Sequence, residues 1–255
     1  MKSIILFVSI LLATTTSYAK CASSGIWCLS KSNTLNKNGI IILDFYCFSQ
    51  DIVSKLNSKY PIYLKSSKEK IPLKVIDTLK GEMQLTQVIL KATSILKTNE
   101  IYTLQIDNTD GSVPLLNRYN DSTKQWETIT FRVSNIIDKN APILAYPSVE
   151  QKKTLHAYGC GPAKWVYFSI TAQDQSEVFV KATVKNKTTL KTTSYILNIE
   201  NGMVKIGHGM CSGAFHFDNG DNFEITFQLI DQSGNKGTIS KPISFYKPTF
   251  STGEE

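Results

Sequence analysis

The residues best suited to metal chemistry are three histidines in the second half of the chain, His156, His208 and His216. His156 precedes Cys160, and His208 and His216 flank Cys211. A bond between these cysteines would bring His156 and His208 together and give zinc, with His216, its three or four ligands at about 2.0–2.3 Å. The spacing matches no standard zinc motif, and an oxidised cysteine offers no thiolate. We therefore expect ordinary loop and surface histidines, no metal and no cofactor.

The cysteine count of 5 is odd, so pairing in an oxidising compartment leaves one thiol over. We expect Cys160 to bond Cys211, since both lie in glycine-rich segments, and this loop of about 50 residues would stabilise the fold by about 3–4 kcal/mol. Our preferred second pair is Cys28 with Cys47, leaving Cys21, although the pairing among these three stays open. A bonded Cys211 cannot serve as a nucleophile beside His208, because that role requires a thiolate.

The N-terminus predicts the compartment. A short basic start, an apolar run at Ile4–Ala13 and a small-x-small end at Ala19 are typical of a signal peptide, and the run is too short to span a bilayer. We expect a mature chain from Lys20 that is secreted, periplasmic or on the cell surface. Lipidation at Cys21 is disfavoured, because Tyr18 and Lys20 stand where a lipobox has an aliphatic and a small residue.

The formal net charge of +7 comes almost entirely from scattered lysines, with Arg118 and Arg132 as the only arginines. Arginine is the preferred reader of phosphate and guanine edges, so this composition disfavours nucleic acid as a partner. It favours a solvated basic surface with weak affinity for acidic glycans or lipid headgroups. No second apolar stretch reaches the length of a transmembrane helix.

The sequence carries no nucleophile elbow, His-Glu-x-x-His helix, P-loop or dinucleotide fingerprint. A pair of carboxylates could act in a glycosidase, but sequence alone cannot place two of them across a groove. Acids such as Glu224 and Asp44 are more simply explained as groups on the solvent face or at the end of a strand. We expect no catalytic activity, and a secreted hydrolase with an unrecognised carboxylate site remains an alternative.

Strand patterns dominate from Gly39 onward, and the alternation is strictest at Phe223–Leu229, where apolar and polar residues take turns. Such alternation predicts strands with one buried and one solvated face. A short helix is expected at Ser49–Ser58, capped by Ser49. The expected strands are Ile40–Phe48, Pro61–Lys65, Ile71–Leu79, Gln84–Leu90, Ile101–Ile106, Ile129–Val133, Trp165–Ala172, Val178–Val184, segments around Tyr195–Ile199 and Ile239–Phe245, and the shorter Met203–Ile206 and Ala214–Phe217.

Strand after strand without alternating helices predicts an all-β fold in which two sheets face each other in each domain. The segment Ile137–Pro147, with two prolines, interrupts the strand rhythm and indicates a domain junction. The expected organisation is a cleaved signal peptide at 1–19, β-sandwich domains at 20–137 and 138–248, and a flexible tail at 249–255.

Two turns carry a family resemblance. Asp231-Gln232-Ser233-Gly234-Asn235 before a closing strand, and the junction Asp138-Lys139-Asn140-Ala141-Pro142, resemble bacterial immunoglobulin-like modules. Leu96-Lys97-Thr98-Asn99-Glu100-Ile101-Tyr102-Thr103-Leu104 is similar to a related type in surface-layer and secreted proteins. The resemblance implies two tandem immunoglobulin-like domains in a secreted or cell-surface protein, and it implies a fold rather than a function.

The candidate binding residues are His208 and Gly209, in the glycine-rich loop Gly207–Gly213, and Trp165 and Tyr167, on the less apolar face of their strand. Loops on rigid scaffolds often carry binding, and aromatic rings serve as sugar platforms. We expect a non-catalytic binding or scaffolding protein of the bacterial cell envelope, whose partner is an unknown protein or glycan. The alternative is an adhesive carbohydrate-binding module with exposed aromatics. The oligomeric state does not follow from the sequence.

Overall fold

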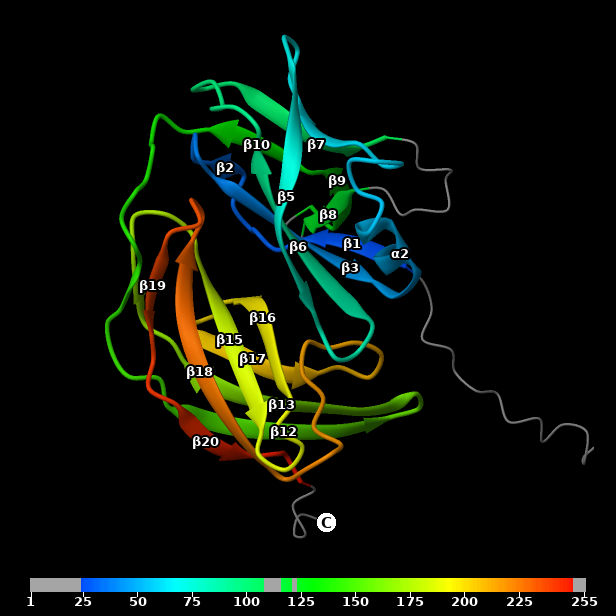
Figure 1. The fold of residues 1–255 in the computed structure, drawn as a ribbon, viewed down its shortest axis with the longest axis vertical. Helices are drawn as coiled ribbons and strands as arrows, with labels where there is room; N and C mark the ends of the chain where they lie inside the picture. The colour runs from blue at the N-terminus through cyan, green and yellow to red at the C-terminus, as the bar shows by residue number, and fades with distance from the viewer. Residues whose placement is uncertain (1–23, 108–115, 121–122, 250–255) are drawn as a thin grey trace, which may run out of the picture.

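The computed structural model describes residues 24–107, 116–120 and 123–249, and these are almost entirely β-strands and their connections (Figure 1). The expected signal peptide, Cys21 and all but the first residue of the expected tail lie outside the described residues. Within the described part of the chain, no helix has the length and apolar character needed to cross a membrane. The all-β prediction is confirmed.

The first half of the chain forms an eight-stranded sheet with the order β1-β3-β6-β5-β4-β7-β10-β2. All neighbours in it are antiparallel except β10 and β2. The strands are β1 (Gly25–Cys28), β2 (Thr34–Leu35), β3 (Ile40–Tyr46), β4 (Ile62–Lys65), β5 (Lys70–Lys80), β6 (Leu85–Ala92), β7 (Ile101–Ile106) and β10 (Thr130–Val133). A separate hairpin pairs β8 (Asn117–Asn120) with β9 (Gln125–Thr128).

This sheet folds over at β5, which pairs with β4 through its first residues and with β6 through the rest, with an irregularity between Val75 and Asp77. The curled sheet encloses an apolar core contributed by residues 26–133. Strand β3 is buried on both faces: Leu43 lies in this core, and Ile40 and Ile42 face the second half of the chain. Burial on both faces explains why β3 is a continuous apolar run rather than an alternating one.

In the second half, two sheets face each other across a second core. Phe168 from one sheet contacts Phe227 and Phe245 from the other, with ring centroids 5.4 and 5.5 Å apart. One sheet contains β12 (Glu150–Tyr158), β13 (Gly161–Ser169) and β17 (Met203–His208), in that order. The other contains β16 (Thr192–Asn198), β15 (Val178–Asn186), β18 (Asn222–Asp231), β19 (Lys236–Ile239) and β20 (Ile243–Tyr246). A small pair joins β11 (Ile143–Leu144) to β14 (Ala172–Gln173).

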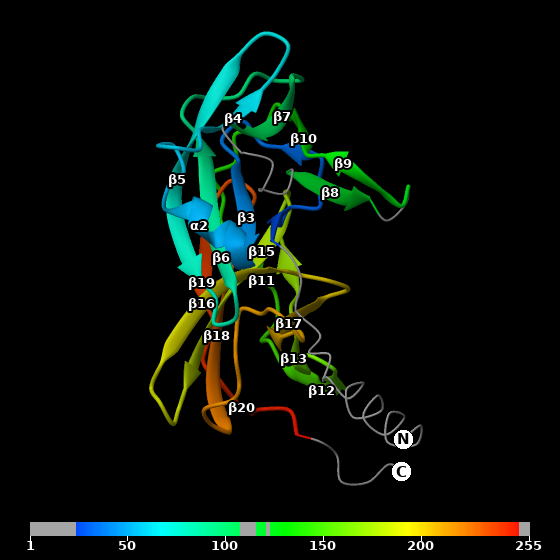
Figure 2. The ribbon, with the colours of Figure 1, turned by 90° about the vertical axis from the view of Figure 1, so that its right-hand side faces the viewer.

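The two halves stack along the long axis of the molecule and meet through a third apolar cluster (Figures 1 and 2). Its buried members come from β3, β6, β15, β16 and β18, and are Ile40, Ile42, Ile89, Phe179, Ile196 and Ile230. The contact between the halves is therefore made by strand faces as well as by connecting loops.

One local prediction holds only in part, and another is wrong. The segment Ser49–Ser58 forms only a 3-10 turn (Cys47–Ser49, η1) and one helical turn (Gln50–Val53, α2), and the Ser49 side chain makes no capping bond. A piece this short depends on packing, which Ile52 provides by entering the first core. Ala214–Phe217 is a loop rather than a strand, although Phe215 and Phe217 are buried and His216 points the other way, as its alternation suggests.

The preferred pair of Cys28 with Cys47 does not form. Cys28 lies opposite Leu43 in the β1–β3 ladder and Cys47 follows β3, so they are separated by about 13 Å along the strand direction, beyond disulfide reach. Both are thiols, and burial raises the pKa of Cys28 to about 12. Cys211 is disulfide-bonded, and its loop adjoins that of Cys160. The pairing expected between these two cysteines stays a prediction.

Candidate functional site

The predicted binding residues Trp165 and Tyr167 lie on the outer face of the three-stranded sheet β12-β13-β17. Strand β13 alternates, so that Val166 and Phe168 enter the core while Trp165 and Tyr167 point outward and are half-buried. Two residues along a strand are about 6.6 Å apart, so the two rings are neighbours on one surface. The expected outward orientation is confirmed for both side chains.

Two lysines from the neighbouring strands lie over these rings. Lys205 of β17 is directly opposite Tyr167 in the ladder, and its Nζ lies 4.0 Å from the centroid of Trp165 and 5.9 Å from that of Tyr167. Lys152 of β12 is opposite Tyr167 on the other side, with its Nζ 4.7 Å from that ring. Each contact has cation–π geometry, worth about 0.5–1 kcal/mol at an exposed site, which holds the ammonium groups in place. We call Lys152, Trp165, Tyr167 and Lys205 the aromatic–lysine strip.

The strip is positively charged as a whole. At the strand positions that the ladders assign to this face, the other side chains are neutral or histidine, and none is a carboxylate: Thr154, His156, Tyr158, Ala163, Ser169 and Met203. His156 lies in this face beside Tyr158, with ring centroids 6.3 Å apart, rather than near His208. The surface therefore presents ammonium donors and aromatic edges with no built-in counter-charge.

Glycines in β17 and the loop after it bring the backbone against this face. A side chain at Gly207, where φ is +136°, would place its Cβ 2.0 Å from the Lys164 carbonyl oxygen, so only glycine fits there. At Gly209 the corresponding Cβ position lies 3.7 Å from Cζ2 of Trp165, so the indole rests against this part of the loop. Of the predicted binding residues, Gly209, Trp165 and Tyr167 are thus brought together.

His208 does not join them. As the last residue of β17 it points to the opposite face of the sheet, is 1% exposed, and lies beside His216 and Phe217. Burial lowers its pKa, partly offset by the bond to the Gly209 carbonyl. Sequence reasoning placed His208 in the exposed loop, whereas the strand continues through it; the missed partners, Lys152 and Lys205, required the strand register.

Asp44 and Glu224, the two acids considered above as catalytic candidates, lie in different parts of the structure and do not form a pair. Asp44 lies between the two halves of the chain, where its Oδ1 accepts bonds from the Tyr195 hydroxyl and the Gln87 amide, each 2.8 Å long. Glu224 belongs to β18 and lies directly opposite Lys185 in the ladder. The local strand environment of each acid therefore explains its position without a catalytic role.

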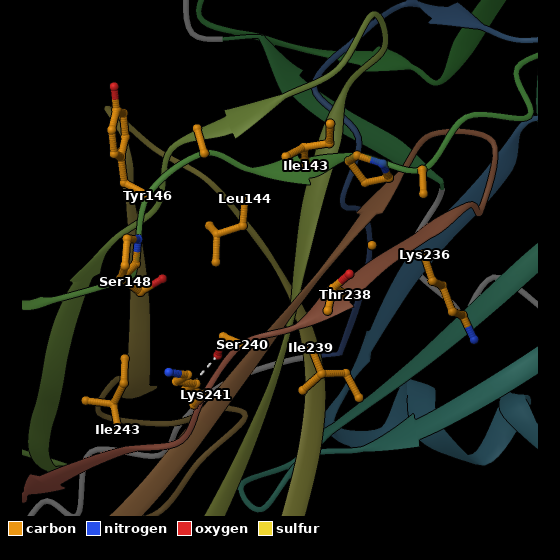
Figure 3. A pocket seen from close by; sticks show the side chains of 15 residues that line it. Ile143, Leu144, Tyr146, Ser148, Lys236, Thr238, Ile239, Ser240, Lys241 and Ile243 are labelled. Carbon is orange, nitrogen blue, oxygen red and sulfur yellow. Dashed lines mark hydrogen bonds between the residues drawn. The ribbon is translucent and has the colours of Figure 1, made fainter.

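A separate groove of about 570 Å³ lies between the junction segment 141–148 and the edge strand β19 (Figure 3). Exposed Ile143, Tyr146 and Ile239 line it, and the Ser240 hydroxyl donates to the Lys241 carbonyl at 2.9 Å. The two walls lie close together at Gly237, where a Cβ would lie 2.4 Å from the Pro142 carbonyl oxygen. Apart from Lys236 and Lys241, its lining is uncharged, so it offers a ligand fewer charged groups and oriented aromatic rings than the aromatic–lysine strip does.

No protein-family model and no curated protein matches the chain. Similar solved structures include a type I pullulanase from Bacillus subtilis complexed with maltose, at 11% identity and TM-score 0.25. The match covers 88% of this chain and 28% of the pullulanase chain. A pullulanase from Anoxybacillus complexed with maltotriose matches at 12% identity and TM-score 0.24 over 86% of this chain and 28% of its own. Dimeric latent PorU from Porphyromonas gingivalis matches at 8% identity and TM-score 0.28, over 91% of this chain and 20% of its own. This chain therefore spans less than a third of each of these proteins, and TM-scores this low do not indicate a shared function.

Proposed function

We propose that this chain is a secreted, non-catalytic binding protein that acts at or outside the bacterial cell envelope. Its two halves are two tandem immunoglobulin-like β-sandwiches, and the aromatic–lysine strip of the second binds an acidic polysaccharide. The observation that carries the proposal is the placement of Lys205 and Lys152 over the outward rings of Trp165 and Tyr167.

The charge of the strip favours an acidic glycan over a neutral one. A neutral sugar stacks its C–H face on an open aromatic ring, whereas here an ammonium group lies 4.0 Å from the Trp165 centroid. A carboxylate or sulfate group can instead accept N–H bonds from both ammonium groups, while the sugar ring rests on the remaining aromatic surface. Spread along one strand face, these contacts suit a polymer with repeated negative charges.

The test measures binding of the untagged mature protein to heparin and polygalacturonate, with dextran as the neutral comparison, by titration calorimetry. We expect binding to the acidic polymers only, weakening as salt rises. Lys205→Gln and Trp165→Ala should each reduce affinity at least fivefold. The matched controls are Lys187→Gln, in the β15–β16 turn, and Trp126→Ala, in β9 of the first half.

The controls separate a site from general charge attraction. If Lys187→Gln weakens binding as much as Lys205→Gln does, net charge rather than the strip drives the interaction and the proposal fails. Binding to dextran as tight as binding to heparin would overturn the preference for acidic polymers.

A further inference from the structure

His208 carries a buried nitrogen without a hydrogen-bonding partner. The side chain is 1% exposed, and its Nδ1 lies 2.9 Å from the Gly209 carbonyl oxygen. A carbonyl only accepts, so Nδ1 carries the proton and Nε2 presents a lone pair. Nε2 is fully buried and has no partner among the described residues. Buried polar atoms are normally paired, so this lone pair calls for an explanation.

Two further ligand groups lie beside it. His216 has its ring centroid 4.8 Å from that of His208, and its Nε2 is 2.9 Å from Oδ2 of Asp218. One ligand atom from each of the three side chains lies within 4.8 Å of the other two. In a tetrahedral zinc site, ligand atoms about 2.0–2.1 Å from the ion stand roughly 3.3 Å apart, so a small contraction brings the three atoms to coordination distance.

Two contacts hold the loop that carries His216 close to His208. Gly213 pairs with His208 in an isolated bridge, and a Cβ on Gly213 would lie 2.2 Å from that of His208, so the loop packs directly against the Cα and Cβ of His208. The backbone N–H of His216 donates to the Glu82 carboxylate at 3.0 Å, which ties the loop to the first half of the chain. The loop after β17 therefore returns His216 to His208 in a fixed position.

We propose that His208, His216 and Asp218 form a binding site for one Zn²⁺ ion per chain. Two imidazoles and a carboxylate suit a borderline divalent metal such as zinc, and three protein ligands leave one position for water or an anion. The Gly209 carbonyl orients His208 as the outer partners of metal-bound histidines do. The side chains of His216 and Asp218 are 29% and 49% exposed, which gives the ion a route from solvent.

A lysine ammonium group lies beside the site. Lys164 of β13 lies 2.6 Å from Oδ1 of Asp218, which leaves Oδ2 for the metal but places a positive charge close to it. This charge weakens binding relative to a closed four-ligand site, so we expect micromolar affinity. The site is on the core-facing side of β13 and β17, whereas the aromatic–lysine strip is on the outer side, so the two proposals stand independently.

The test is calorimetric titration of the untagged, disulfide-intact protein with ZnCl₂, alongside its thermal unfolding midpoint with and without the metal. We expect one ion per chain, a higher midpoint with zinc, and no response to Mg²⁺. His216→Gln and Asp218→Asn should each reduce zinc affinity at least tenfold. Both residues are partly exposed, and metal-free midpoints show whether the variants fold.

His156→Gln is the matched control, because it removes a histidine from the outer face and should leave zinc binding unchanged. No heat and no change of midpoint with zinc would overturn the proposal. Undiminished zinc binding by folded His216→Gln and Asp218→Asn would also overturn it, since the ion would then lie elsewhere.

Discussion

Asp44 is a carboxyl group held between the two halves of the chain. Burial raises its pKa to about 6, against the lowering effect of the bonds from Tyr195 and Gln87. The pKa of Tyr195 is raised in turn, first by its own burial and then by the neighbouring Asp44 charge. The folded protein therefore holds a proton on Asp44 more tightly than the unfolded chain, whose carboxyl has the ordinary value of 3.8.

The stability contribution of this proton follows from its two pKa values. It is fully present below pH 4 and is lost as the pH rises through about 6, because the folded state must then keep a charge in a poorly solvated place. At about 1.4 kcal/mol per pKa unit, the loss approaches 3 kcal/mol. Asp44→Asn keeps an acceptor oxygen and removes the titration. We expect the variant to match the wild type at pH 4 and to be more stable at pH 7.5 in urea unfolding; parallel pH profiles would contradict this.

The glycine density of the loop after β17 could be interpreted from sequence only as a need for tight turns. Gly207 and Gly213 are there because β13 and the His208 side chain leave no space for a Cβ. Trp165 and Tyr167 could be assigned to the outer face from alternation within a single strand. Lys205 and Lys152 could not, because their positions depend on the register of β17 and β12 against β13, which no local pattern fixes.

At the scale of elements, alternation located most strands because one face of each is buried. It missed β12, whose residues Glu150–Tyr158 are polar or exposed almost throughout, since this strand lies at the edge of its sheet. It also missed the short β1, which is ordered by pairing with β3. Strands that owe their conformation to a neighbour rather than to their own burial leave little trace in the sequence.

The turn between β18 and β19 shows an element fixed by one side chain. Asp231 is fully buried, and its Oδ1 accepts the backbone N–H groups of Ser233 and Asn235, each at 2.8 Å. Gly234 has φ at +86°, which favours glycine at this corner. Asn235 extends the network by donating to the Asp138 carbonyl at 3.2 Å, so the turn also positions the junction between the halves.

Replacing this carboxylate should weaken the fold. Asp231→Ala leaves two backbone N–H groups without their acceptor, and we expect a loss of about 2–3 kcal/mol in the free energy of unfolding, measured in urea. The matched control is Asp77→Ala, which removes an exposed aspartate of β5 whose carboxylate accepts the neighbouring Thr78 N–H at 2.8 Å. Its cost should be below about 1 kcal/mol. Equal losses of unfolding free energy in the two variants would show that the buried Asp231 carboxylate stabilises the fold no more than an exposed one does.

At the scale of the whole molecule, the junction at Ile137–Pro147 was predicted from prolines and polar residues, but the extent of contact between the halves was not. The continuous apolar run of β3 was the available signal: a strand of a two-layered domain with one wet face would alternate. In the structure, its second face is covered by Phe179, Ile196 and Ile230 from the other half. A sequence pattern shows that a face is buried, not which distant strand covers it.

Polar bonds specify how the two halves join. Gln87 of β6 is fully buried; its amide donates to the Ile196 carbonyl at 2.9 Å and its oxygen accepts the Ile196 N–H at 3.0 Å. One side chain thus satisfies both backbone groups of a residue in β16, as a neighbouring strand would. Such a fully satisfied buried amide favours one relative position of the halves over others that bury the same apolar area.

Removing that amide tests whether the halves unfold as one unit. Gln87→Ala leaves both Ile196 backbone groups unpaired at the contact, and we expect it to lower the free energy of unfolding by about 3 kcal/mol. Because the apolar cluster spans both halves, the wild type should unfold in a single calorimetric transition whose midpoint falls in the variant. Gln105→Ala, a half-buried glutamine of β7 outside this contact, is the control and should cost below about 1 kcal/mol. Two separate transitions in the wild type would mean that the halves are stable independently and that Gln87 only orients them.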